Sequence, residues 1–345
     1  MRYRDAGVDV ARADAIKERL GATVRATWSA AVHPLTGGFA GVAAWPEKPG
    51  VLLAATMDGV GTKLHLARAA GRLADAAADL VYHCANDLLV HGARPFAFLD
   101  YIAQSRLEAD AVQTLVEGLA RACREVGAAV LGGETAEMPD IYVTGAVDLA
   151  GCMIGVLDAE DLLDGRAVRA GDRVLGLASA GLHTNGFSLA RRVLADSGLD
   201  LADRLPDGRG ETVGDALLAP HRWYGPALGP LVHGAHGQAP VRALAHVTGG
   251  GVAGNLVRVL PEGARARLSA STWARPAVFR WLIETGRVPE ADAREALNLG
   301  IGMIVVCDSA QADALAARLE GAGERVYALG DVVAGERGVE WTEGP

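Results

Sequence analysis

The sequence predicts an α/β fold (α+β in the broader sense) made of two domains, and three observations support this. The chain has 345 residues, which is enough for two domains that each bury a core. Apolar strand-like runs alternate with helical spacing of apolar residues in both halves. The 44 glycines follow no collagen-like period and indicate many tight turns. Because residues 159–171 are polar and turn-rich, we expect domains at residues 1–168 and 169–345.

Composition narrows the classes of partner. A net charge of -9 and a pI near 5.5 argue against a nucleic-acid or membrane-surface binder, so we expect small molecules or protein as partners. The four cysteines lie far apart in apolar stretches and are expected to be free thiols: Cys84, Cys123, Cys152 and Cys307. The chain begins without the apolar segment of a signal peptide, and we expect it to be cytoplasmic.

Residues 58–63, Asp-Gly-Val-Gly-Thr-Lys, are the first candidate site. They follow an apolar run at residues 51–57 that is typical of a buried strand, and they precede a predicted helix at 64–70 that Thr62 could cap. The glycine spacing fits neither a P-loop nor a dinucleotide fingerprint. Asp58 could hold a cation and Lys63 could reach a phosphate; the alternative is an ordinary turn with a chance aspartate and lysine.

Two further carboxylates extend this hypothesis. Asp87 falls on the apolar face of a predicted helix at residues 74–90, where it requires a compensating partner, and Asn86 offers a second oxygen. Glu134 follows a short predicted strand at residues 128–131. Carboxylates without a cysteine or histidine cluster favour Mg²⁺, which usually accompanies phosphates. For Asp87 a structural salt bridge or a cap is the alternative.

The second half repeats the order of strand, glycine loop and helix. A strand is predicted at residues 173–178 and a helix at 187–195, and the loop between them contains His183 and Asn185. Thr248 precedes a run of three glycines before another predicted helix at 252–260. Such a run can free helix amides to bind an anion, so it is a candidate phosphate cradle, although it could also be only a loop.

Taken together, seven ordered motifs resemble the phosphoribosylformylglycinamidine cyclo-ligase family, also called aminoimidazole ribonucleotide synthetases. They lie at residues 5–9, 58–63, 86–87, 132–139, 183–186, 248–251 and 298–303. The resemblance implies a cytosolic homodimer of two-domain chains, in which the N-terminal sheets pair as a β-barrel-like interface. It also implies that ATP and Mg²⁺ are used to close the imidazole ring of formylglycinamidine ribonucleotide, by phosphorylation of the formyl oxygen, with release of ADP and phosphate.

The resemblance also implies a role for each motif. Asp58, Asp87 and Glu134 would hold Mg²⁺, and His183, Asn185 and Asp87 would act at the reacting amide. The ATP-binding residues implied are Asp58, Gly59, Gly61, Thr62, Lys63, Asn86, Gly133 and Glu134. The substrate phosphate would be held by Thr248, Gly249, Gly250 and Gly251.

Some positions depart from the family pattern, and relatives offer alternatives. Gly21 stands where a basic residue is usual, Asp140 where glycine is usual, and His221 where threonine is common. The alternatives are a selenophosphate synthetase, a thiamine-monophosphate kinase, a hydrogenase-maturation dehydratase, or an inactive homologue retained as a binding scaffold. The first cysteine is Cys84 and the chain ends in Gly-Pro, so the selenium and hydrogenase enzymes, which have a cysteine near one terminus, fit less well.

Overall fold

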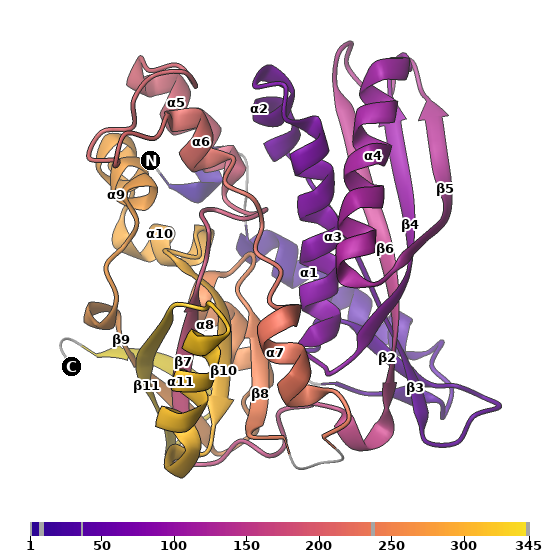
Figure 1. Ribbon diagram of the computed structural model, residues 1–345, viewed down its shortest axis with the longest axis vertical. Coiled ribbons are helices and arrows are strands. Elements are labelled where there is room, and N and C mark those ends of the chain that lie inside the picture. Colours follow the sequence, from indigo (N-terminus) through magenta and orange to yellow (C-terminus); the bar gives the residue numbers. More distant parts are fainter. Residues whose placement is uncertain (1, 7–9, 36, 236–238, 343–345) are drawn as a thin grey trace.

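The computed structural model describes residues 2–6, 10–35, 37–235 and 239–342. Residues 7–9 of the first motif and Thr36 lie outside these ranges. Two six-stranded sheets stand side by side, with helices packed around and between them (Figure 1). The N-terminal half of the chain forms one sheet and the C-terminal half the other, which agrees with the expected α/β class.

The N-terminal sheet has the strand order β1-β2-β3-β6-β4-β5. Its strands are β1 (Val32–His33), β2 (Gly41–Ala44), β3 (Val51–Gly59), β4 (Arg94–Gln104), β5 (Ala129–Glu137) and β6 (Val147–Asp158). Among the strand pairs described in this sheet, only β4 and β5 are parallel, because the long helix between them carries the chain back to the starting edge. The helices of this half are α1 (Val10–Arg25), α2 (Lys63–Ala69), α3 (Leu73–Leu89) and α4 (Ala109–Val126).

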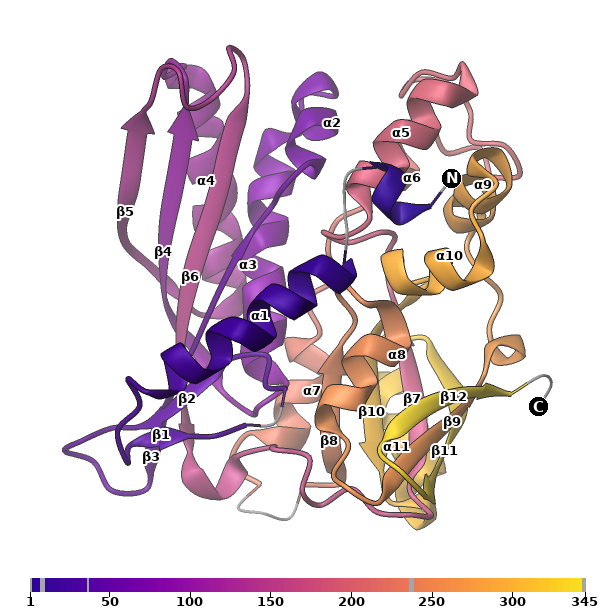
Figure 2. The ribbon, with the colours of Figure 1, turned by 180° about the vertical axis from the view of Figure 1, so that it is seen from behind.

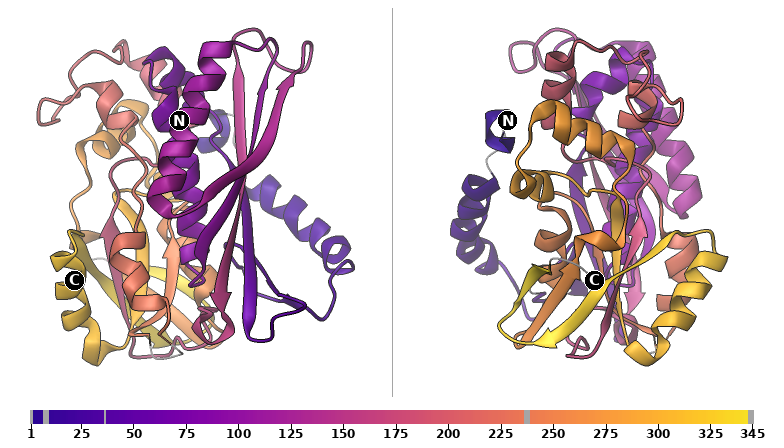
Figure 3. Two further views of the ribbon diagram at one scale, coloured as in Figure 1. Left: turned by 45° about the vertical axis from the view of Figure 1, so that its right-hand side comes forward. Right: turned by 90° about the vertical axis from the view of Figure 1, so that its left-hand side faces the viewer.

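Helices α3 and α4 cover one face of this sheet (Figure 3, left). The apolar spacing of α4 turns Leu115, Leu119 and Cys123 into the core, and Gly127 ends the helix with a φ of 79°. Almost every side chain of α3 is buried, because this helix lies between the sheet and the C-terminal half. Its polar residues must therefore find partners inside the protein.

The other face of the N-terminal sheet carries apolar side chains that remain exposed. Met57, Cys152 and Leu99 stand in one row across strands β3, β6 and β4. Met57 is 69% exposed and Leu99 is 38% exposed. On the same side of the sheet, helix α1 crosses near the lower end and carries exposed Ile16 and Leu20 (Figure 2).

The C-terminal sheet has the strand order β12-β9-β11-β7-β10-β8, and only β9 and β12 are parallel. Its strands are β7 (Arg173–Ala178), β8 (Val241–His246), β9 (Ala264–Ser269), β10 (Ile301–Cys307), β11 (Val326–Ala334) and β12 (Gly338–Thr342). Strand β10 lies in the middle and is buried throughout. Its helices are α5 (Phe187–Ser197), α6 (Val213–Leu217), α7 (Gly225–Val232), α8 (Gly251–Leu256), α9 (Ala277–Gly286), α10 (Glu290–Ala296) and α11 (Ala312–Gly321).

The strand predicted at residues 128–131 is longer than expected. Strand β5 continues to Glu137, so Gly133 and Glu134 lie within it rather than in a loop after it. The predicted strand at 173–178 and the predicted helix at 74–90 match β7 and α3 to within one residue. The cysteines are free, as expected. Within the described ranges, no helix is both long and apolar enough to cross a membrane.

Candidate active site

Helix α3 contributes a polar stripe to the junction between the two halves. Asp79, His83, Asn86 and Asp87 are spaced so that they share one face of the helix. Asn86 Nδ2 donates to the Arg222 carbonyl at 2.8 Å, and its Oδ1 accepts from the Tyr224 amide at 3.2 Å. Asn86, which we expected to bind ATP, is thus used in holding the C-terminal half against α3.

Lys63 is engaged in a similar way. Its Nζ lies 2.5 Å from Asp79 Oδ2 and donates to the His183 carbonyl at 2.7 Å. The side chain is only 1% exposed and also stands over the ring of Phe187. A direct contact with a phosphate would require Lys63 to leave a buried ion pair, so this geometry lends no support to that predicted role.

Asp58 and Asp87 meet around one histidine. His83 Nε2 donates to Asp58 Oδ2 at 2.8 Å and lies 3.8 Å from Asp87 Oδ2. Burial alone would lower the pKa of His83, but the two carboxylates outweigh it and raise this pKa to about 9. Burial acts to raise the pKa of Asp58, but His83 and the Gly59 amide outweigh it and hold that pKa below its usual value. Two of the predicted carboxylates therefore lie together around His83. The Asp58 side chain is 41% exposed to solvent, so a ligand can reach it.

A chain of hydrogen bonds runs from Asp87 into the C-terminal half. His246 Nδ1 donates to Asp87 Oδ1 at 2.8 Å. His246 Nε2 lies 3.0 Å from His221 Nε2, and His221 Nδ1 lies 2.8 Å from the Thr184 hydroxyl. Burial lowers the pKa of His246, and it lowers the pKa of His221 well below its usual range with help from neighbouring imidazoles. These two rings are therefore neutral near pH 7.

His183 lies beside this chain, stacked on His221 with the ring centroids 4.1 Å apart. It adopts a φ of 61°, which is uncommon outside glycine and is often found at functional sites. Burial lowers the pKa of His183 well below its usual range, and nearby His246 and Lys63 lower it further. Asn185 lies farther along the same loop, near Gly249, where a Cβ would be 3.4 Å from the Asn185 Oδ1 atom.

Glu134 does not join the other two carboxylates. Opposed residues across a sheet share a face, and Asp58, Gly151, Asp100 and Gly133 form one such row facing α3. Glu134 is the next residue along β5 and so points to the open face. Three strand spacings also separate it from β3, about 14 Å. Within one chain this geometry lends no support to a Mg²⁺ shared by Glu134, Asp58 and Asp87, because Glu134 lies on the opposite face of the sheet and three strands away.

Gly133 has a packing role. A Cβ at this position would lie 2.5 Å from both the backbone oxygen and the carboxylate of Asp100. Gly133 is therefore packed closely against Asp100, and this position lends no support to its predicted part in binding ATP.

The triple-glycine loop is held internally. The Gly250 amide donates to the Glu295 carbonyl and the Gly251 amide donates to the Thr248 carbonyl. Asn255 Nδ2 lies within 3.4 Å of the carbonyls of Thr248, Gly249 and Gly251. Two of the amides expected to cradle a phosphate are thus already bonded, and the predicted role would require the loop to rearrange.

Thr62 borders a cavity next to the Asp58–Lys63 turn. The cavity has a volume of about 760 Å³ and lies between α2 and α5, with Thr62, Ser188 and Arg191 in its walls. The hydroxyls of Thr62 and Ser188 are 3.2 Å apart. Gly61 adopts a φ of 65°, so the turn before Thr62 requires a glycine there. Hydroxyls and an arginine suit a polar, anionic ligand.

Sequence reasoning missed three histidines of this site: His83, His221 and His246. His83 lies four residues before Asp87, which places both on one helical face, and this spacing was an available signal. His221 was noted only as a departure from the family pattern, and His246, two residues before Thr248, was not singled out. Their convergence depends on tertiary packing that local periodicity does not report.

The fold is that of a class of two-domain α/β proteins, with buried carboxylates and histidines where the two halves meet. The N-terminal domain of the AIR synthase related proteins matches residues 37–157, and the C-terminal domain of the same proteins matches residues 169–342. Curated proteins named phosphoribosylformylglycinamidine cyclo-ligase are 42–47% identical to this chain over nearly its full length, so the chain belongs to that family and is an enzyme.

Its relatives match over nearly their whole length. The phosphoribosylformylglycinamidine cyclo-ligase of Sorangium cellulosum is 47% identical over 335 residues, covering 96% of this chain and 95% of the relative. The cyclo-ligase of Synechococcus sp. strain CC9605 is 42% identical over 341 residues, covering 98% of this chain and 97% of the relative. The thiamine-monophosphate kinase of Stenotrophomonas maltophilia has a similar structure, with a TM-score of 0.63, 20% identity and coverage of 95% and 96%. At this identity the kinase shows a shared fold only.

Proposed function

We propose that this enzyme closes the imidazole ring of formylglycinamidine ribonucleotide with ATP and releases aminoimidazole ribonucleotide, ADP and phosphate. The observation that carries the proposal is the sequence identity of 42–47% to cyclo-ligases over nearly the full length of both chains. The substrate is therefore a small ribonucleotide. The alternative kinase and dehydratase functions rest on likeness of fold alone.

Asp58 and Asp87 fit a Mg²⁺ ion that accompanies ATP. Both carboxylates lie within 3.8 Å of His83 Nε2, and Asp58 is accessible. Mg²⁺ in nucleotide enzymes commonly takes one or two carboxylates together with phosphate oxygens and water, so two suffice without Glu134. ATP would supply the phosphoryl group that makes the formyl oxygen a leaving group. The cavity beside Thr62 and Arg191 has room for a phosphate-bearing ligand.

His183 and Asn185 are proposed to act on the substrate. A neutral His183 can accept a proton as the ring closes, and its depressed pKa would make it release that proton readily. Asn185 lies next to Gly249 and can orient an amide group of the substrate. Asp87 would position His246 through their hydrogen bond while it helps to hold the cation.

The domain boundary near residue 168 and the homodimer also belong to this proposal. Each half of the chain on either side of residue 168 has a sheet of its own. The exposed apolar face of the N-terminal sheet is the surface that a second copy would cover, in a β-barrel-like arrangement.

The deciding experiment supplies purified enzyme with ATP, Mg²⁺ and formylglycinamidine ribonucleotide, and measures the aminoimidazole product. We expect product and ADP in equal amounts. Asp87→Asn keeps an oxygen for His246 but removes the charge, so it should lose Mg²⁺-dependent turnover with little change in melting temperature. Release of ADP without the aminoimidazole product would refute the proposed reaction.

A further inference from the structure

Four imidazole rings gather where the two halves meet: His83, His183, His221 and His246. They are at most 2% exposed, and the ring centroids of neighbouring members lie 4.1 to 5.3 Å apart. His83 faces the carboxylates of Asp58 and Asp87 and donates to Asp58. The other three come from the C-terminal half, and the rings of His221 and His246 also contact the His83 ring.

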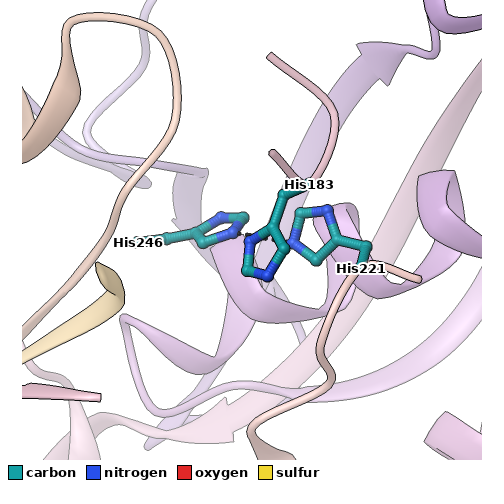
Figure 4. A group of neighbouring side chains, drawn as sticks. All are labelled: His183, His221 and His246. Carbon is teal, nitrogen blue, oxygen red and sulfur yellow. Dashed lines mark hydrogen bonds between the residues drawn. The ribbon is translucent and has the colours of Figure 1, made fainter. Parts of the chain in front are cut away.

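One nitrogen from each of His183, His221 and His246 lies within 4.8 Å of the others. Figure 4 shows the three rings converging, with His183 lying across the contact between the other two. The Nε2 atoms of His221 and His246 are 3.0 Å apart. Two imidazole ligands of a tetrahedral Zn²⁺ ion are about 3.3 Å apart, because each Zn–N bond is about 2.0–2.1 Å long. A small outward movement of this pair would therefore admit the ion.

The far sides of these two rings are already fixed. His246 Nδ1 is bound to the Asp87 carboxylate and His221 Nδ1 to the Thr184 hydroxyl, each at 2.8 Å. Metal-bound histidines generally have such outer partners, which orient the ring and set its tautomer. When a metal takes both Nε2 atoms, the proton on His221 Nε2 can move to Nδ1, where the Thr184 oxygen accepts it.

His183 has a nitrogen that needs a partner. Its Nδ1 is buried without a hydrogen-bond partner among the described residues. Its Nε2 accepts only long contacts from the Ala180 and Arg222 amides, at 3.3 and 3.4 Å. The ring can therefore turn toward a ligand while losing only weak hydrogen bonds.

We propose that His183, His221 and His246 form a binding site for a transition-metal cation of the Zn²⁺ class. Three imidazoles favour Zn²⁺, Co²⁺ or Ni²⁺ over Mg²⁺, which prefers oxygen ligands. Three protein ligands leave a fourth position for water. The site adjoins the carboxylates proposed for Mg²⁺ through the hydrogen bond from His246 to Asp87, but its ligand atoms are imidazole nitrogens. A metal here would occupy His183 and inhibit turnover; that consequence rests on the proposed function, whereas binding itself does not.

The test uses the whole chain without a polyhistidine tag, stripped of metal and kept in excess Mg²⁺. Zn²⁺ is titrated by calorimetry and Co²⁺ by visible absorption, both without ATP or ribonucleotide. We expect one equivalent to bind and Co²⁺ to give the intense absorption of a four-coordinate site. His221→Thr, which places the residue common in the family, should weaken binding by at least about tenfold. Thr184→Val removes an outer partner and should weaken it by about 10–100-fold.

His65→Asn is the matched control, because His65 is an exposed histidine outside the cluster and its loss should leave binding unchanged. Melting curves without metal establish whether each variant is folded. If His221→Thr is unfolded, the binding measured for Thr184→Val decides the test. The proposal is overturned if the wild-type chain binds no stoichiometric Zn²⁺. It is also overturned if Asp58→Asn, rather than the His221 and Thr184 variants, abolishes binding. Since no substrate is present, a chain that binds Zn²⁺ but makes no aminoimidazole product would contradict only the proposed function.

Discussion

At the scale of single residues, Lys63 illustrates how burial changes the role that a motif suggests. A lysine beside a glycine turn often binds phosphate, but Lys63 forms a buried ion pair with Asp79. Removing one partner of a buried ion pair leaves the other charge uncompensated, which typically costs about 3–5 kcal/mol. The residue thus contributes to joining α2, α3 and the His183 loop.

We therefore expect Lys63→Met to lower the free energy of unfolding by about 3–5 kcal/mol, measured by urea denaturation. Lys48→Met is the control, because Lys48 is exposed, and it should change stability by less than about 0.5 kcal/mol. A variant with wild-type stability but greatly weakened ATP binding would instead assign Lys63 to the nucleotide.

His91 gives a prediction about pH. Its Nε2 accepts from the Phe39 amide and its Nδ1 donates to the Leu163 carbonyl, so the buried ring is used in its neutral form. Burial lowers the pKa of His91 from its ordinary value of 6.5. Above pH 6.5 the ring is neutral in both folded and unfolded states. Below it, the unfolded chain binds a proton that the folded chain does not, so stability falls as the pH falls.

His91→Gln can make both hydrogen bonds but does not titrate. We expect its free energy of unfolding to decrease less than that of the wild type between about pH 7 and pH 5.5. Denaturation at several pH values measures the difference. Parallel pH dependences for the two proteins would mean that His91 is protonated as readily when folded as when unfolded.

At the scale of elements, the packing of α3 against α4 depends on one glycine. A Cβ at Gly118 would lie 2.2 Å from the Ala74 carbonyl oxygen, which is part of the backbone and has little room to move. Glycine in a helix interior usually costs about 1 kcal/mol relative to alanine. Here the close approach of the two helices outweighs that preference.

We expect Gly118→Ala to destabilise the protein by about 1–3 kcal/mol, the usual cost of overpacking. Gly321→Ala, in α11, is the matched control because nothing lies within 4 Å of the added Cβ, and it should be neutral or stabilising. Thermal melting of both variants measures the contrast. Equal effects would show that helix propensity, and not the α3–α4 contact, decides the result.

Local pattern was sufficient for elements with strong periodicity, such as α3 and β7. It failed for β5, where two glycines suggested a loop although the strand continues, because pairing with β4 determines where a strand ends. The site follows the same division. The sequence marked Asp58 at the end of a predicted strand, Asp87 on an apolar helix face and His183 in a loop between a strand and a helix. It could not bring His221 and His246 to Asp87, since more than 130 residues separate them.

At the scale of the whole molecule, the two halves are joined through the polar face of α3. Asp79 accepts from the His221 amide, Asn86 binds the segment before α7, and Asp87 binds His246 at the end of β8. The proposed catalytic groups therefore stand on an interface that also holds the domains together. Small changes in the angle between the halves would alter the distances between Asp58, Asp87 and the C-terminal histidines.

The open face of the N-terminal sheet leads to the last prediction, which concerns assembly. Met57, Leu99 and Leu131 are exposed apolar residues of strands β3, β4 and β5, on a sheet whose other face is covered by helices. Exposed apolar surface of this kind is typical of an interface, and Met57 is the most exposed of these three residues, at 69%. Placing a charge there would leave an unpaired cation buried when two copies associate, at a cost of several kcal/mol.

We expect the wild-type chain to be a dimer by sedimentation velocity and Met57→Lys to be a folded monomer, because Met57 contacts solvent in a single copy and its replacement disturbs no core. Val116→Lys is the control, since Val116 is a similarly apolar exposed residue on α4, behind the same sheet, and this variant should remain dimeric. A monomeric wild-type chain would reject the dimer itself. A dimeric Met57→Lys protein would place the interface elsewhere, with the exposed stripe of Ile16, Leu20 and Val24 on α1 as the next surface to alter.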